Sequence, residues 1–144
     1  MRSLAASSLT MSSAIRKPAY HCPSEAAIGV LGGRWKLLIL AELVGGARRF
    51  SELSSSLPRV TDKVLTSQLR ELEADGVVSR VVHYEFPPRV EYVLSYGAGD
   101  VKGLIEALDA WGTAFLDSQP HLVAQASSMV RPHFVTDSHP PESG

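Results

Sequence analysis

The chain has 144 residues, of which 44% are apolar and 20% charged, and these values fit one globular domain. They exclude a disordered chain, and the single cysteine excludes a scaffold stapled by internal disulfides. The longest unbroken apolar run covers residues 37–41, whereas a helix that spans a bilayer needs about 20 apolar residues. Residues 1–13 lack the apolar core of a signal peptide. We therefore expect a cytoplasmic protein without a membrane partner.

The charge is unevenly distributed along the chain, although it sums to −1. Residues 1–90 hold 12 basic and 8 acidic side chains, whereas residues 91–144 hold 2 basic and 7 acidic ones. DNA-binding domains often have a pI above about 9, so the overall charge argues against DNA. The basic part of a dipolar chain can still bind a polyanion. The charge therefore permits a nucleic-acid partner without requiring one.

Three helices are predicted in the first part of the chain. Pro23 suits the first position of a helix with Cys22 as its N-cap, and the glycine pair that follows should end this helix. A second helix is expected over 34–44, because apolar residues recur there with the helical period. A third, short helix is expected to begin after Ser51 as its N-cap.

The fourth predicted helix has the clearest pattern. Thr61 suits its N-cap, and Leu65, Leu69 and Leu72 recur at the i, i+4, i+7 spacing of one buried face. Gly76 should end the helix shortly afterwards. The opposite face is therefore polar and exposed.

The residues that follow predict a β-hairpin and one more helix. Runs of β-branched residues at 77–83 and 89–94 flank a proline-containing loop, and an amphipathic helix is expected over 101–117. Two helices joined by a tight turn and followed by a hairpin are the layout of a winged helix-turn-helix. The predicted fold is thus mainly α-helical with a small β-hairpin wing, an additional N-terminal helix and a C-terminal helix. The expected parts are a flexible N-terminal arm at 1–21, the winged helix-turn-helix domain at 22–118 and a loosely ordered C-terminal tail at 119–144.

The polar face of the fourth helix and the arginines around it are the candidate DNA contacts. Arg and Lys can reach guanine or phosphate, and Ser and Thr can reach bases or the backbone. On this recognition helix the candidates are Thr61, Lys63, Thr66, Ser67 and Arg70. In the flanks and the wing they are Arg48, Arg49, Ser51, Arg59, Arg80 and Arg89. The alternative is that this face is simply solvated, as the outer face of most helices is.

Three segments resemble the HxlR-type winged helix-turn-helix regulators of bacteria, a family within the broader MarR-like group. These are CPSEAAIGVLGGRWKLLIL, RRFSELSSSLPRVTDKVLTSQLRELEADGVVSR and PPRVEYVLS, within residues 22–111. The resemblance implies a homodimeric transcription factor, often a repressor, that binds a palindromic operator and dimerises through its first and last helices. The expected dimer interface is the apolar stripe Val101, Leu104, Ile105, Leu108, Trp111 and Phe115. The alternative is that this stripe covers the core of its own domain.

Cys22 is the candidate redox sensor. In several members of the family a cysteine just before the first helix reacts with oxidants or electrophiles, and a helix N-terminus favours the reactive thiolate. Glu25 opposes this effect, and Arg16, Lys17 and His21 could offset Glu25. The alternatives are an inert capping cysteine and a small-molecule effector held between the first and last helices.

No other chemistry is expected from the sequence. The five histidines lack metal-ligand spacing, and no nucleophile, base and orienting acid occur together, so we expect no metal, no cofactor and no enzymatic activity. The expected partners are double-stranded DNA, a second copy of the chain and an oxidant or small-molecule effector. The aromatic residues expected to pack rather than to bind a ligand are Tyr20, Trp35, Tyr84, Phe86 and Trp111. Two functional alternatives remain: a small-molecule or nucleotide sensor, and a protein-interaction adaptor, both without direct DNA readout.

Overall fold

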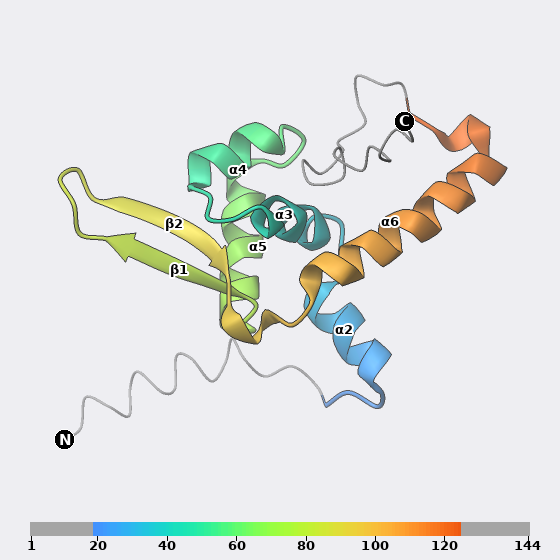
Figure 1. The fold of residues 1–144 in the computed structure, drawn as a ribbon, viewed down its shortest axis with the longest axis horizontal. Coiled ribbons are helices and arrows are strands. Elements are labelled where there is room, and N and C mark those ends of the chain that lie inside the picture. The colour runs from blue at the N-terminus through green and yellow to red at the C-terminus, as the bar shows by residue number, and fades with distance from the viewer. Residues whose placement is uncertain (1–18, 125–144) are drawn as a thin grey trace, which may run out of the picture.

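The computed structural model describes residues 19–124, which form five α-helices and one β-hairpin (Figure 1). The arm expected at 1–21 and the tail expected at 119–144 lie mostly outside these residues. The mainly helical fold with a hairpin wing and a helix at each end is confirmed. The elements are α2 (Pro23–Leu31), α3 (Lys36–Val44), α4 (Phe50–Ser56), α5 (Asp62–Ala74), β1 (Val78–His83), β2 (Arg89–Leu94), η1 (Tyr96–Ala98), α6 (Val101–Ser118) and η2 (Pro120–Leu122).

The ends of α2 and α5 follow the predicted signals. Cys22 is the N-cap of α2 with Pro23 in the first turn. The Thr61 hydroxyl oxygen accepts a hydrogen bond from the Val64 amide at 3.2 Å and so caps α5. Gly76 follows α5 with a φ of +76°, a conformation that costs glycine little.

Two helix starts differ from the prediction. Helix α4 has Arg49 rather than Ser51 as its N-cap, and the Glu52 carboxylate accepts the Arg49 amide at 3.1 Å. Ser51 therefore lies inside the first turn. Helix α3 begins at Lys36 with Trp35 as its N-cap. Residues 34 and 35, which were expected in this helix, therefore lie before its first turn.

The core lies between α3, α4, α5, the base of the hairpin and the start of α6. Leu65, Leu69 and Leu72 of α5 are at most 1% exposed, which confirms the predicted stripe. Helix α3 contacts α4, α5, α6 and β2, and it is therefore buried on most sides rather than along one face.

The hairpin is held to the helical part through the segment before α4. Its strands pair from Val78 opposite Leu94 to His83 opposite Arg89. The Arg48 amide donates to the Tyr92 carbonyl at 3.0 Å, and the Tyr92 amide donates to the Arg48 carbonyl at 2.7 Å. This bridge fixes the base of the wing beside the helix-turn-helix.

The first turns of helix α6 pack against the core of the domain, and its later turns extend beyond the core (Figure 1). The Asp100 carboxylate caps the helix by accepting the Gly103 amide at 2.9 Å. Val101 and Ile105 are buried in the core, whereas no residue after Ile105 in α6 is buried. The distal turns therefore project away from the winged domain.

Candidate nucleic-acid interface

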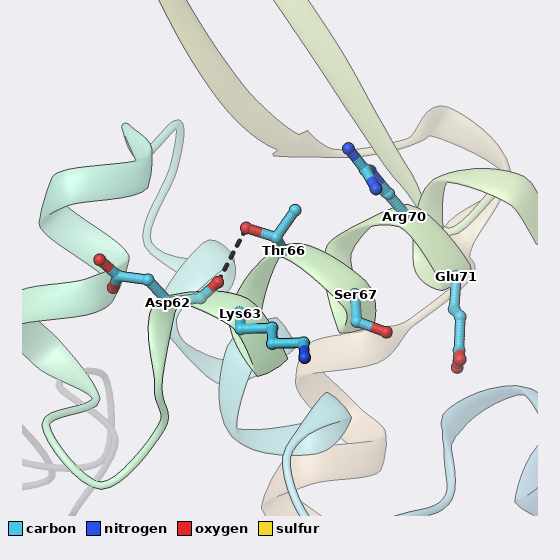
Figure 2. A pocket seen from close by; sticks show the side chains of 6 residues that line it. All are labelled: Asp62, Lys63, Thr66, Ser67, Arg70 and Glu71. Atoms are coloured by element: carbon cyan, nitrogen blue, oxygen red, sulfur yellow. Dashed lines mark hydrogen bonds between the residues drawn. The ribbon is translucent and has the colours of Figure 1, made fainter.

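The polar face of α5 is exposed on the side opposite its three buried leucines (Figure 2). Lys63, Ser67 and Arg70 are exposed, and Thr66 is half-buried. With two carboxylates they line an open surface depression of about 530 Å³. The sequence therefore predicted the exposure of this face correctly.

The acidic side chains at this depression are held by partners. The Ser54 hydroxyl donates to the Asp62 carboxylate at 2.7 Å, which joins α4 to the start of α5. Glu71 lies 2.6 Å from the ammonium group of Lys36, whose side chain is only 6% exposed. The negative charge of Glu71 is thus balanced from beneath the helix, and the cations on the face dominate its field.

The Thr66 hydroxyl is already used within α5, because it donates to the Asp62 carbonyl at 2.8 Å (Figure 2). The same is true of Thr61, whose oxygen caps the helix. Both hydroxyls therefore stabilise the helix that was predicted to contact DNA.

Arg70 connects the recognition face to the wing. Together with Thr66 and Glu73 of the same helix, it lines a second depression of about 370 Å³ that also includes Arg80 of β1 and Tyr92 of β2. Among residues 19–124, neither Arg70 nor Arg80 takes part in an ion pair. Two cations from different elements therefore face the same open surface.

Arg89 differs from Arg80, although both were predicted as wing contacts. Its guanidinium lies 3.1 Å from the Glu91 carboxylate and 3.7 Å from that of Glu85. The ring of His83 also lies 3.1 Å from Glu91. The charge of Arg89 is therefore balanced inside the wing, while that of Arg80 is available to a partner.

The remaining predicted flank residues surround the helix-turn-helix. Arg49 is exposed at the start of α4, next to the exposed Ser51, and Arg59 is exposed in the turn between α4 and α5. Arg48 is only half-exposed, and its Nε is buried without a hydrogen-bond partner. Of these four residues, Arg48 is therefore the least accessible to DNA.

Two aromatic residues of the hairpin loop contradict the prediction that they pack. Tyr84 is 93% exposed and Phe86 is 102% exposed. Both lie in the loop between β1 and β2, which extends beyond any surface of the core (Figure 1). Their position in a proline-containing loop was the sequence signal for exposure, because loop tips rarely reach a core.

Cys22 is exposed at the start of α2, and its side chain makes no capping hydrogen bond. The nearby Glu25 carboxylate accepts the His21 amide at 2.6 Å, and the His21 ring lies 3.2 Å from it. His21 thus occupies the position that was expected to offset Glu25, whereas Arg16 and Lys17 lie outside the described residues. The thiol is accessible to a reagent or to a second thiol.

The apolar stripe of α6 divides into two parts. Val101 and Ile105 are 3% and 6% exposed and belong to the core of the domain, so for these two residues the structure supports the alternative to a dimer contact. The other four members remain uncovered: Leu104 at 37%, Leu108 at 45%, Trp111 at 70% and Phe115 at 42%.

The uncovered part of α6 continues onto α2. Ile28 of α2 is 71% exposed, and with Leu104 and Leu108 it lines an apolar depression of about 150 Å³. The rings of Trp111 and Phe115 are stacked with their centroids 5.4 Å apart. These side chains form one apolar surface, which we call the α2–α6 surface.

Two further features bear on the chemistry of the described residues. Across residues 19–124, no three His, Cys, Asp or Glu side chains are grouped so that they could hold a metal ion. None of the helices formed by these residues is long and apolar enough to cross a membrane.

Comparison with known proteins places this chain in a family. Residues 30–120 match the sequence model described as HxlR-like helix-turn-helix. The HTH-type transcriptional regulator YtcD of Bacillus subtilis is 47% identical over 98 residues, which cover 68% of this chain and 78% of YtcD. The reduced form of the redox regulator HypR has a TM-score of 0.64 and 36% identity over 69% of this chain and 99% of that chain. The reduced form of the B. subtilis regulator YodB has a TM-score of 0.60 and 34% identity, over 67% and 95% of the two chains. The chain therefore belongs to the HxlR-like helix-turn-helix family of transcriptional regulators.

Proposed function

We propose that the protein is a homodimeric repressor that inserts α5 into the major groove of a palindromic operator in the cytoplasm. The observation that carries the proposal is the group of exposed cations Lys63, Arg70 and Arg80 on α5 and β1, which outnumber the one carboxylate, Glu73, in the depression shared by the two arginines. Ser67 lies between these cations and offers a hydroxyl to bases or backbone. The ion pair of Glu71 with Lys36 supports the same assignment, because it lowers the negative charge that this side of α5 presents to phosphates.

The α2–α6 surface supports the homodimer. Four large apolar side chains of one helix and Ile28 of another are too many to leave in water without a partner. A two-fold axis places the same surface on both copies. It also places the two α5 helices on one side of the dimer, where half-sites lie about 34–36 Å apart.

The substitution Arg70→Ala tests the DNA face. We expect operator affinity to fall by about 1–3 kcal/mol, which is the usual contribution of a base contact. The matched control is Arg34→Ala, because Arg34 is exposed in the turn before α3 and lines neither depression of the α5 face. Fluorescence anisotropy with a duplex selected by the parent protein gives both affinities. Equal binding by Arg70→Ala and the parent protein would contradict the assignment of this face.

The exposed thiol of Cys22 and the redox regulators among the relatives support control by oxidation. With a peroxide as oxidant, one thiolate takes one oxygen and becomes a sulfenic acid while the second oxygen leaves as water. The Cys22 thiol of the second copy then displaces another water and completes a disulfide between the copies. This bond changes the spacing of the two α5 helices and with it the affinity for the operator.

The substitution Cys22→Ser tests this control. The parent protein should release the operator in hydrogen peroxide and rebind it after a thiol reductant is added, whereas the variant should stay bound throughout. Release of DNA by both proteins would end the redox proposal. The remaining hypothesis would then be control by a small apolar effector bound in the depression beside Ile28 and Leu108.

A further inference from the structure

The tip of the wing carries an aromatic side chain with no partner in the domain. The Phe86 ring is fully exposed in the loop that joins β1 to β2, and it is followed by Pro87 and Pro88. A fully exposed phenylalanine forgoes the stabilisation that burial in a core would provide. Its place at the end of the most extended element indicates a contact outside the chain (Figure 1).

We propose that Phe86 is an apolar wedge that enters the minor groove beside the α5 site and inserts its ring between two base pairs. The inference rests on the proposed function and adds a specificity-determining residue to it. Apolar side chains that enter the minor groove unstack a base step and bend the duplex. Pyrimidine–purine steps deform most easily, so a step of this class is expected under the wing.

The length of the hairpin suits this contact. Helix α5 packs against β1, and Arg70 and Arg80 share one depression at the base of the wing. Strands of six residues extend about 20 Å at 3.3 Å per residue. The neighbouring minor groove lies half a helical turn, about 17 Å, from the centre of the major-groove site. The hairpin is therefore long enough to span the distance between the two grooves.

The charges around the tip favour DNA over an apolar protein partner. Phe86 lines a depression of about 280 Å³ together with Arg49 and Arg89. The acidic neighbour Glu85 lies 3.7 Å from Arg89, so the tip does not present an isolated negative charge. An apolar ring beside the exposed guanidinium of Arg49 suits a groove whose floor is formed by base edges and whose rims are phosphates.

The loop also limits the entropy that the contact costs. Pro87 and Pro88 restrict φ on the C-terminal side of Phe86. A loop that is restricted before binding loses less freedom on binding. The wedge is thus presented by a stiffened support.

The test compares the parent protein with Phe86→Ala, Phe86→Leu and the control Tyr84→Ala on one selected operator. 2-Aminopurine, placed in turn at each step of the flanking minor groove, reports unstacking by an increase in fluorescence. Bending is measured by energy transfer between the ends of the duplex. Tyr84 suits the control because it is 93% exposed in the same loop but adjoins β1.

The parent protein should show an increased signal at one step and a bent duplex. Phe86→Ala should lose both and bind about tenfold more weakly, Phe86→Leu should retain part of each, and Tyr84→Ala should stay within about threefold of the parent. All four proteins should have the same melting temperature, because both side chains are exposed.

Three outcomes overturn the inference, and the first two of them leave the proposed function intact. If Phe86→Ala binds and bends DNA like the parent protein while Arg70→Ala loses affinity, the insertion of Phe86 is refuted and the proposed regulator function stands. Weaker binding by Phe86→Ala with unchanged fluorescence and bend replaces insertion by a surface contact. Absence of selective DNA binding by the parent protein removes both proposals.

Discussion

The substitution Trp111→Ala provides a quantitative test of the proposed dimer. The Trp111 side chain is 70% exposed in the single chain, which is about 175 Å² of a side chain of about 250 Å². At about 25 cal/mol per Å², full burial against a second copy would contribute about 4 kcal/mol. If half of this area is covered, each copy contributes about 2 kcal/mol and the two-fold dimer about 4 kcal/mol. Such a loss raises the dissociation constant of the dimer about a thousandfold.

Sedimentation equilibrium of the parent and the variant measures this change. The matched control is Thr113→Ala, an exposed position of the same helix that lies away from the apolar stripe, and its dissociation constant should stay within about threefold of the parent. Circular dichroism should show equal helix content for all three proteins. Trp111 contributes its stack on Phe115 to the monomer, so the loss of monomer stability should be about 1 kcal/mol or less.

The reasoning is refuted if Trp111→Ala dimerises as tightly as Thr113→Ala. In that case the second copy does not cover Trp111, and the α2–α6 surface has another occupant. A monomeric parent protein at tens of micromolar would have the same meaning.

Three further substitutions test the α5 helix and its supports. Thr61→Ala removes the cap of α5 and should lower the free energy of unfolding by about 1 kcal/mol in urea titrations. Leu69→Ala removes a side chain that is 1% exposed and should cost about 2–5 kcal/mol in the same assay, so a smaller loss would mean that the core is looser than described. Lys36→Met leaves the charge of Glu71 unbalanced beside Arg70 and should weaken operator binding in anisotropy titrations. Adding Glu71→Gln should restore the binding, and failure to restore it would assign Lys36 a purely structural role.

The helix α5 could be predicted from sequence because several independent signals agree there. Thr61 supplies a capping hydroxyl, three leucines repeat at the helical period and Gly76 ends the helix. Each signal is local, and none depends on what the helix packs against.

The predicted start of α4 was wrong because more than one residue can serve as its N-cap. Ser51 has the better capping side chain, but the N-cap lies two residues earlier, where the Glu52 carboxylate accepts the Arg49 amide. Phe50 is then placed against the core. Tertiary packing therefore decided between two starts that local propensity leaves close together.

Residue type alone does not predict which of the wing arginines forms an ion pair. Arg80 and Arg89 are the same residue type, yet only Arg89 has a carboxylate, that of Glu91, two positions away on the same face of its strand. The sequence pattern also does not predict what covers the exposed part of the α6 stripe. A periodic pattern shows which face is apolar, but whether that face meets its own domain or a second copy depends on how far the helix extends beyond the core.

The overall charge of −1 predicts weak electrostatic attraction to DNA, whereas the arrangement of the charges predicts a strong one. The acids of the last helix lie on α6, away from the α5 face, and the Glu71 charge is balanced by Lys36. Lys63, Arg80, Arg49 and Arg59 remain exposed around the helix-turn-helix as candidate phosphate contacts, while Arg70 is assigned to a base. Two copies then contribute about eight phosphate contacts, for which the logarithm of the operator affinity should fall with the logarithm of salt concentration with a slope of about −7. Anisotropy titrations between 50 and 300 mM salt, about the usual range for such slopes, measure it directly. A slope near zero would mean that the net charge, and not the cationic face, governs this protein, and it would favour a sensor or adaptor that does not bind DNA.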